Sequence, residues 1–127
     1  MRAVRGRDTG PELALRRALW REGVRGWRTH LKDVPGRPDI GFRNLRTAVF
    51  VDGDFWHGRD WPALGEKLTP EWRAKIGRNR ERDRAVTLAL EMRGWLVLRF
   101  WETDIGRDPG LVARLVAEQV RQRRVLR

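Results

Sequence analysis

Hydrophobic residues alternate with small or polar ones over two short stretches in the first half of the chain, residues 40–42 and 47–51. A period of two is typical of β-strands that bury one face. The two stretches are joined by the mainly polar residues 43–46, a connection short enough for a hairpin. We therefore predict an antiparallel hairpin that brings Asp39 and Asp52 toward the same end of a small sheet.

Apolar residues at helical spacing predict one helix before this hairpin and two helices after it. The first helix is predicted from its N-cap Thr9 to about Glu22, and Glu12 completes a capping box. We expect this helix to bury one face. That face is formed by Leu15, Leu19 and Trp20.

The two later helices are predicted by their start and stop signals. The longer one begins at Pro70, behind the N-cap Thr69, and extends to Arg93, before a glycine that stops it. The last one begins at residues 108–109 and carries apolar side chains at helical spacing. A basic tail of residues 121–127 follows, and we expect it to be frayed.

Two further strands complete the predicted elements. They are residues 25–30 and the mostly apolar residues 95–101, which suit a buried strand. The order is then helix, three strands, helix, strand, helix, which predicts a mixed α/β fold around a small sheet. With 127 residues, the chain is long enough for one domain and too short for two of ordinary size.

The chain is strongly basic. Its formal net charge is +11, and only three of its 28 basic residues are lysines, so 25 are arginines. Arginine pairs bidentately with phosphate groups and guanine edges, and this excess therefore indicates a nucleic-acid partner. An arginine-rich proteome would produce the same count without functional meaning, so the charge alone does not decide between these explanations.

Cysteine is absent, which excludes disulfides and thiolate metal sites. We recognise no secretory segment and no apolar run of membrane-spanning length in the sequence. We therefore expect an intracellular, cytoplasmic protein that does not bind membranes.

Three acids and a histidine lie around the hairpin strands. Asp39 precedes the first strand, Asp52 ends the second, and Asp54 and His57 follow. Two converging carboxylates and a nearby His suit a hard divalent cation and a base that activates water. An Asp-Gly-Asp sequence is also an ordinary turn. The two aromatic residues directly before His57 favour the functional interpretation, because large aromatics are costly to expose.

A larger set of motifs follows in order along the chain. The set consists of Arg7-Asp8-Thr9 with Glu12, Pro35-Gly36-Arg37-Pro38-Asp39, Val49-Phe50-Val51-Asp52-Gly53, Phe55-Trp56-His57-Gly58, Trp72, Lys75-Ile76-Gly77-Arg78-Asn79, Arg82-Asp83 and Gly94-Trp95. This ordered set resembles the very short patch repair (Vsr) mismatch endonucleases. The resemblance covers most of the chain, from Met1 to about Glu102, and the ordered set is more specific than any single motif.

The resemblance implies a restriction-endonuclease-like fold, of the PD-(D/E)xK superfamily, and a Mg²⁺-dependent DNA endonuclease. The family's essential metal-binding aspartate falls on Asp39, and the second acid of this fold class falls on Asp52. The backbone carbonyl of Val51 is a further candidate ligand. Many nucleases of this fold carry a lysine two residues after the second acid, but here Asp54 stands in that place. His57 is therefore the candidate general base.

Glu12 has two interpretations, because a capping-box residue already has a structural role. By resemblance it also falls where the family places an acid near the active site, and one carboxylate can serve both roles. The other histidine, His30, is expected to make a local hydrogen bond rather than to take part in catalysis.

Family members commonly carry a structural zinc held by Cys and His residues. Here the corresponding segments read Gly58-Arg59-Asp60-Trp61 and Trp101-Glu102-Thr103. Only Asp83 remains as a ligand, whereas zinc needs about four. We therefore expect no zinc, with Trp61 filling that space by packing. The family also has more basic sequence before the Met1–Arg7 arm, which predicts weaker clamping of DNA by this arm.

Phe55, Trp56 and Trp72 match aromatics that the family inserts between bases at a mismatch, where unstacking costs least. Packing in the core is the alternative for each of them. The predicted DNA contacts on the long helix are Lys75, Arg78, Asn79 and Arg82. A solvated charged face is the alternative for this helix, and we favour it for Arg80 and Arg84.

The leading prediction is a monomeric, Mg²⁺-dependent endonuclease that nicks one strand of duplex DNA beside a T:G mismatch. The resemblance also implies stimulation by a MutL-type mismatch-repair protein. One alternative is a restriction-type or nicking nuclease of the same fold that acts on unmismatched DNA. Another is a DNA-binding module without catalysis, which the presence of Asp39, Asp52 and His57 disfavours.

Overall fold

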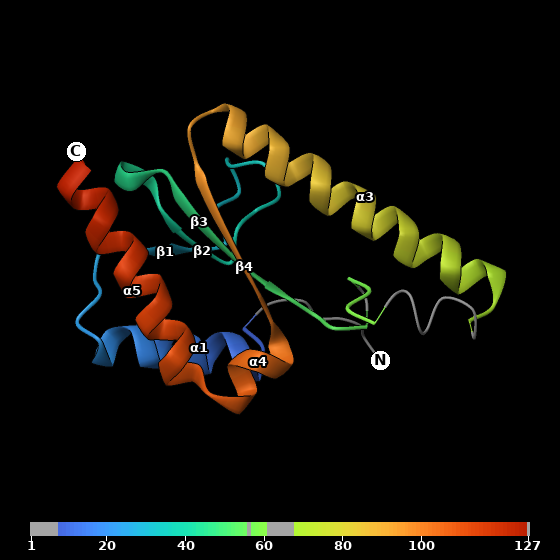
Figure 1. The fold of residues 1–127 in the computed structure, drawn as a ribbon, viewed down its shortest axis with the longest axis horizontal. Coiled ribbons are helices and arrows are strands. Elements are labelled where there is room, and N and C mark those ends of the chain that lie inside the picture. The colour runs from blue at the N-terminus through green and yellow to red at the C-terminus, as the bar shows by residue number, and fades with distance from the viewer. Residues whose placement is uncertain (1–7, 56, 61–67, 127) are drawn as a thin grey trace.

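A four-stranded mixed sheet lies at the centre of the fold (Figure 1). The computed structural model describes residues 8–55, 57–60 and 68–126. Strands β1 and β2 and strands β2 and β3 pair antiparallel, whereas β3 and β4 pair parallel. The strands are β1 (Arg28–Thr29), β2 (Ile40–Phe42), β3 (Thr47–Asp52) and β4 (Leu96–Trp101), in this order across the sheet.

The predicted hairpin is confirmed. Ile40 of β2 lies opposite Val49 of β3, and Phe42 lies opposite Thr47. The connection contains a short 3₁₀ helix, η1 (Arg43–Leu45), and ends at Arg46, which has a left-handed φ of 47°. Because the two strands run antiparallel, the start of β2 lies beside the end of β3. Asp39 and Asp52 therefore lie near the same end of the sheet.

Helices cover both faces of the sheet. Helices α1 (Gly10–Arg21), α4 (Glu102–Arg107) and α5 (Pro109–Leu126) contact one another on one side, and α3 (Pro70–Met92) lies on the other (Figure 1). Helix α3 connects β3 to β4, as a parallel pair of strands requires a long crossover. The order of elements confirms the predicted α/β architecture.

Strand β3 is buried on both faces because its alternate side chains enter two different clusters. Val49 packs with residues of α1 and α5, including Leu15, Leu19 and Val116. Ala48 and Phe50 instead pack with Leu31 and with Leu90 of α3. Burying an aliphatic side chain of this size contributes about 1.5–3 kcal/mol. The strand that ends at Asp52 is therefore the most firmly held of the sheet.

The expected burial of Trp20 is wrong, although Leu15 and Leu19 are fully buried. Trp20 is one position around the helix from Leu19 and is 58% exposed. Its ring lies beneath the guanidinium of Arg25 and edge-on to Trp27. The Trp20 ring is thus stabilised by a cation–π contact at the surface rather than by packing in the core.

Two predicted strands differ from the observed ones. The strand expected over residues 25–30 is limited to the two residues of β1, because Gly26 and His30 on either side have positive φ angles of 91° and 51°. Strand β4 has the expected position but is only half-buried, because it lies at the edge of the sheet. The short helix α4 was not predicted, and α5 continues through Leu126, where fraying was expected.

Helix α3 has both predicted signals at its ends. The Thr69 hydroxyl accepts a hydrogen bond from the backbone nitrogen of Trp72, and Gly94 follows the helix with a φ of 84°. Over its 23 residues only Ile76 and Leu90 are buried, so most of the helix presents charged side chains to solvent. None of the helices in the described ranges is long and apolar enough to cross a membrane.

Candidate active site

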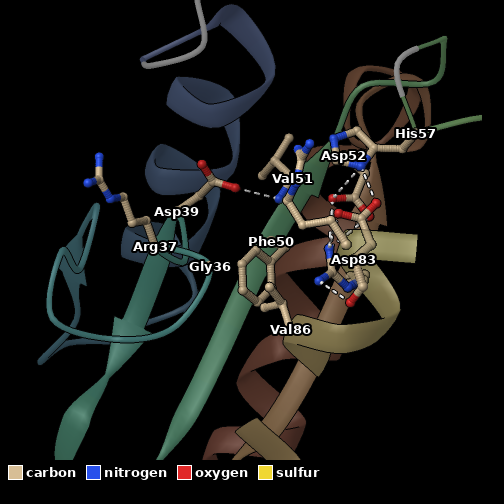
Figure 2. Close-up of a pocket in the computed structure, with 11 residues that line it drawn as sticks. Gly36, Arg37, Asp39, Phe50, Val51, Asp52, His57, Asp83 and Val86 are labelled. Atoms are coloured by element: carbon tan, nitrogen blue, oxygen red, sulfur yellow. Dashed lines mark hydrogen bonds and ion pairs between the residues drawn. The ribbon is translucent and has the colours of Figure 1, made fainter. Parts of the chain in front are cut away.

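A cavity of about 280 Å³ opens at the C-terminal end of β3, between this strand and α3. Three residues predicted from the sequence, Asp39, Asp52 and His57, line it together with Asp83 and Arg99. Figure 2 shows the side chains of Asp52, His57 and Asp83 pointing toward one another, while Asp39 is directed toward the backbone of Val51. The structure thus brings together residues that are up to 60 positions apart in the sequence.

Asp39 directly precedes β2 and is held by the neighbouring strand. Its Oδ2 atom accepts a hydrogen bond of 2.7 Å from the backbone nitrogen of Val51. Burial raises the pKa of Asp39 to about 6, and the negative charges of Glu12 and Asp52 raise it further, against the effects of the Val51 bond and of His30. A half-buried carboxylate with one such donor would be stabilised by a nearby cation.

Asp52 is the last residue of β3 and is almost fully buried. One guanidinium nitrogen of Arg99 contacts both its carboxylate oxygens, at 3.1 and 3.4 Å. Burial raises the pKa of Asp52, while the charges of His57 and Arg99 act in the opposite direction. The pKa of Asp52 is raised overall, because burial is the largest effect and the negative charge of Asp83 adds to it.

His57 lies between two carboxylates. Its Nδ1 atom is hydrogen-bonded to Asp83 Oδ2 and lies 3.9 Å from Asp52 Oδ1. Burial lowers the pKa of His57, but the hydrogen bond to Asp83 and the charge of Asp52 outweigh burial, so the pKa is raised overall. The carboxylates therefore favour a proton on Nδ1.

Arg99 was not identified from the sequence. It extends from β4 across the base of the cavity, where its Nε donates to the Thr87 hydroxyl at 3.0 Å and a terminal nitrogen donates to the backbone carbonyl of Asp83 at 3.3 Å. Its guanidinium also lies 4.2 Å from the centre of the Phe50 ring. One signal could have revealed it, because Arg99 is the single charged residue among the apolar residues of β4.

The turn that carries His57 is held at both ends. The backbone nitrogen of His57 donates to the Gly53 carbonyl at 3.0 Å, and Arg80 donates to the Gly58 carbonyl at 2.9 Å. Gly58 has a φ of 68°, and a Cβ there would lie 3.0 Å from the Ile76 side chain. The bond made by Arg80 corrects the expectation that this side chain belongs to a solvated face.

Asp54, which stands where a lysine was expected, faces away from the cavity. Its carboxylate accepts hydrogen bonds from the Thr103 hydroxyl and backbone nitrogen, at 2.6 and 3.2 Å, and from Arg59 at 3.2 Å. Burial acts to raise the pKa of Asp54, but these donors outweigh it and lower the pKa overall. Arg59 also contacts Asp104 at 3.1 Å, so this network ties the turn to α4.

Glu12 does not line the cavity but belongs to a second cluster beside it. Its backbone nitrogen donates to the Thr9 hydroxyl, as expected for the cap, whereas its carboxylate accepts from the backbone of Asp8 rather than of Thr9. Arg16 lies 3.4 Å and His30 3.8 Å from that carboxylate. Its charge nevertheless contributes to the raised pKa of Asp39. The local hydrogen bond expected for His30 is wrong, because its Nε2 atom contacts Asp8 at 3.3 Å and Arg16 at 3.2 Å, which lie 22 and 14 positions away.

The predicted DNA contacts lie along α3 and on the adjoining turn. Phe55 packs edge-on against Trp72, with ring centres 5.7 Å apart, and Lys75 lies 5.6 Å from the Trp72 ring. Both aromatic rings remain about 40% exposed, which disfavours core packing for them. Arg82 lines the cavity and donates to Asn79 at 3.2 Å, and Arg78 is exposed. Trp56, Trp61 and the arm of residues 1–7 lie outside the described residues.

The donor atoms of the cavity suit a hard cation. Asp39 and Asp52 offer carboxylate oxygens whose charge is destabilised by burial, and the backbone carbonyl of Val51 lies on the strand between them. A second set of possible ligand atoms, from Asp52, His57 and Asp83, lies within 4.8 Å of one another. Carboxylates that can hold a cation, together with a histidine at the same cavity, form an arrangement suited to phosphodiester hydrolysis.

Known proteins resemble this chain over most of its length. Residues 1–63 match the family model described as DNA mismatch endonuclease Vsr. The type II nicking enzyme V.NmeDIP of Neisseria meningitidis serogroup C is 40% identical over 129 residues, which is 99% of this chain and 86% of that protein.

Two further relatives are similar in extent. The type II nicking enzyme V.NaeI of Lentzea aerocolonigenes is 43% identical over 111 residues, covering 82% of this chain and 66% of that protein. The DNA mismatch endonuclease Vsr of Escherichia coli K12 is 37% identical over 111 residues, covering 85% of this chain and 70% of that protein. All three relatives are named for cleaving or nicking DNA.

Proposed function

Because this chain belongs to the Vsr family of DNA endonucleases, whose fold is restriction-endonuclease-like, we propose that it nicks one strand of duplex DNA at a T:G mismatch with the help of Mg²⁺. Strand nicking is the activity common to the family. The mismatch, the metal and the residue roles below are the proposed parts. The observation that carries the proposal is the cavity in which Asp39, Asp52 and His57 meet. Phe55, whose exposed ring packs against Trp72, lies two residues before His57 in the chain.

The three groups divide the chemistry between them. Asp39, Asp52 and the carbonyl of Val51 would hold the metal ion, which supplies charge stabilisation at the phosphate and lowers the pKa of water. The Nδ1 atom of His57 is occupied by Asp83, so its Nε2 atom is the one that would accept a proton from the attacking water. Glu12 would act from outside the cavity, by raising the pKa of Asp39.

Duplex binding is supported by charge and by the position of α3. The net charge of +11 favours contact with phosphates. The predicted DNA contacts lie on α3, which carries Trp72 near its start and lines the cavity with Arg82 and Asp83. Lys75, Arg78, Asn79 and Arg82 would bind phosphates or base edges. Phe55 and Trp72, with Trp56, would stack on bases where a mispair has weakened the duplex.

A single nick by a monomer suits a chain that carries one candidate active site among its described residues. We also propose a MutL-type mismatch-repair protein as a partner, which rests on family membership alone. A cytosine-5 methyltransferase would share the target sequence, since deamination of 5-methylcytosine produces T:G mispairs.

A nicking assay tests the proposal directly. The protein is incubated with Mg²⁺ and duplexes that carry one labelled strand, either with a T:G mispair in varied flanks or fully paired in the same flanks. We expect one nick, next to the mispaired T and strongest in particular flanks. Equal cutting of paired and mispaired duplexes would instead indicate a nuclease of unmismatched DNA, and no cutting with any divalent metal would indicate a DNA-binding module.

A further inference from the structure

We propose that Arg37 binds a backbone phosphate of the DNA strand that is cleaved, next to the phosphate that is hydrolysed. Arg37 lines the cavity two residues before Asp39 and has no part in the chemistry described above. The proposal rests on the proposed function, because it requires that the reacting phosphate binds at the cavity beside Asp39.

The first argument is the charge of the cavity lining. Asp39, Asp52 and Asp83 place three carboxylates around the cavity, and these repel a phosphate unless cations offset them. Arg99 is already engaged with two of these acids, because its guanidinium contacts the Asp52 carboxylate and the backbone carbonyl of Asp83. A cation that contacts DNA must therefore come from another residue of the lining.

The two remaining arginines of the lining are Arg37 and Arg82. Arg82 lies on α3 and donates to Asn79 at 3.2 Å. The side chain of Arg37 is exposed, and it forms no hydrogen bond or ion pair within the described part of the chain. Figure 2 shows Arg37 on the Asp39 side of the cavity, away from Asp83. Its guanidinium is therefore available to a phosphate that lies beside the reacting one.

The second argument is that a rigid loop carries Arg37. The loop before β2 contains a turn in which the backbone nitrogen of Arg37 donates to the Val34 carbonyl at 3.0 Å. Val34 and Pro38, on either side of the turn, are buried. Gly36 has a φ of 78°, and a Cβ there would collide with the Val86 side chain. Because the backbone is fixed in this way, binding a phosphate costs less conformational entropy.

The third argument is the backbone conformation of Arg37. Its φ is 51°, a left-handed conformation that is costly for a residue with a side chain. Three other non-glycine residues of the described ranges have positive φ, but Arg37 is the one that lines the cavity and precedes a proline. Extended backbone is favoured before proline, and glycine would suit a left-handed position better. Strain that persists beside a candidate active site supports a functional role for the side chain.

The test combines a variant of the protein with a modified substrate. Single phosphates of a T:G duplex, other than the one that is hydrolysed, are replaced one at a time along each strand by uncharged methylphosphonates. We expect Arg37→Ala to lower the second-order rate constant for nicking with Mg²⁺ by about 10-fold or more, because a hydrogen bond between two charged groups contributes at least this factor. One methylphosphonate beside the nick, in the cleaved strand, should cause a similar loss for the wild type and little further loss for Arg37→Ala.

Arg114→Ala is the matched control, since it removes an exposed arginine of α5 that does not line the cavity. Its rate constant should match the wild type within about twofold, because exposed charges far from the DNA are screened by salt. The control should also respond to each methylphosphonate as the wild type does. Additive losses for Arg37→Ala at every methylphosphonate position would overturn the proposal, as would coupling confined to the strand that is not cleaved.

Thermal stability separates a phosphate contact from a structural role. Arg37→Gly removes the guanidinium and relieves the left-handed strain, so its melting temperature should rise by roughly 2–5 °C while nicking falls as in Arg37→Ala. Arg37→Lys keeps the charge without the planar fork and should recover part of the rate. If both Arg37→Gly and Arg37→Ala melt well below the wild type, Arg37 holds the loop and the proposal is wrong.

The two proposals fail in different ways. Nicking by the wild type together with undiminished nicking by Arg37→Ala overturns the role of Arg37 and leaves the proposed function intact. Failure of the wild type to nick any duplex overturns the proposed function. The coupling between Arg37→Ala and single methylphosphonates is then measured in the Kd for the duplex, and additive losses at every position would exclude a phosphate contact by Arg37.

Discussion

The carboxylate of Asp39 accepts a hydrogen bond of 2.7 Å from the backbone nitrogen of Val51 on the neighbouring strand. This bond places the acid at the cavity even though Asp39 precedes β2 and is not part of it. Because burial raises the pKa of Asp39 to about 6, the ionised side chain is less stable in the folded protein than in water. The ionised carboxylate of Asp39 therefore lowers the stability of the folded protein.

We predict that Asp39→Asn abolishes nicking and stabilises the fold. The amide keeps an oxygen that can accept from Val51 but carries no charge for a metal. The rise in the pKa of Asp39 by about two units corresponds to roughly 3 kcal/mol of lost stability when the side chain is ionised. Because the side chain is partly exposed, solvent screening reduces this cost. The free energy of unfolding at pH 8 without metal should therefore rise by about 2 kcal/mol in the variant. Denaturant unfolding measures it, alongside the nicking assay.

The pH dependence of this difference follows from the sign of the shift. The folded-state pKa of about 6 is above the model value of 3.8, so wild-type stability falls as pH rises through this window. The gain from Asp39→Asn should therefore be near zero at pH 4 and complete above pH 7. Mg²⁺ should stabilise only the wild type at pH 8. A variant that nicks normally, or that is equally stabilised at pH 4, would contradict the prediction.

The aromatic pair of Phe55 and Trp72 leads to a prediction about mismatch recognition. Replacing either ring with Ala should weaken binding of a T:G duplex by about 10-fold or more, because stacking on one base contributes roughly 1–3 kcal/mol. Binding of paired duplex should change much less, since phosphate contacts dominate it. Fluorescence of a base analogue beside the mispair reports the stacking.

Trp20→Ala is the control for this pair, because Trp20 is exposed on α1 and contacts Arg25 and Trp27. The affinity of the Trp20→Ala variant for the T:G duplex and for the paired duplex should match that of the wild type within twofold. If Phe55→Ala and Trp72→Ala weaken binding of the two duplexes equally, these rings do not discriminate mispairs.

The Arg59 network predicts a coupling between α4 and the turn that carries His57. Arg59→Ala removes contacts to Asp54, Thr103 and Asp104, so amide protons of residues 57–59 should exchange faster with solvent. The nicking rate should fall as the turn loosens, with little change in the melting temperature of the core. Hydrogen exchange measures the first effect, with Arg107→Ala, an exposed arginine at the end of α4, as the control.

We also predict that the purified protein contains no stoichiometric zinc and stays folded in a chelator. The chain has no Cys, and the carboxylate of Asp83 is hydrogen-bonded to His57 in the described structure. Elemental analysis and circular dichroism with EDTA measure these two properties. About one zinc per chain, or unfolding on addition of EDTA, would refute this prediction.

Local patterns in the sequence determined much of the fold. The alternation before Asp52 predicted the hairpin, and the caps at Thr9 and Thr69 marked where α1 and α3 begin. These features depend on residues that are close in the chain, so hydrogen bonds and side-chain periodicity reveal them directly. The same is true of Asp39, Asp52 and His57, which the hairpin and the following turn bring together.

The partners of these residues depended on tertiary structure alone. Asp83 and Arg99 reach the cavity from α3 and β4, and the contacts they make span 26 and 47 positions. The sequence of α3 does not predict which side of the helix faces the sheet. Charged residues occur nearly all round the helix, and only two of its described side chains are buried, which is too few to form an apolar stripe. Packing of those two side chains, Ile76 and Leu90, orients the helix. The sequence therefore identified Asp39, Asp52 and His57 as candidates, whereas the orientation of α3 decided which side chains contact them.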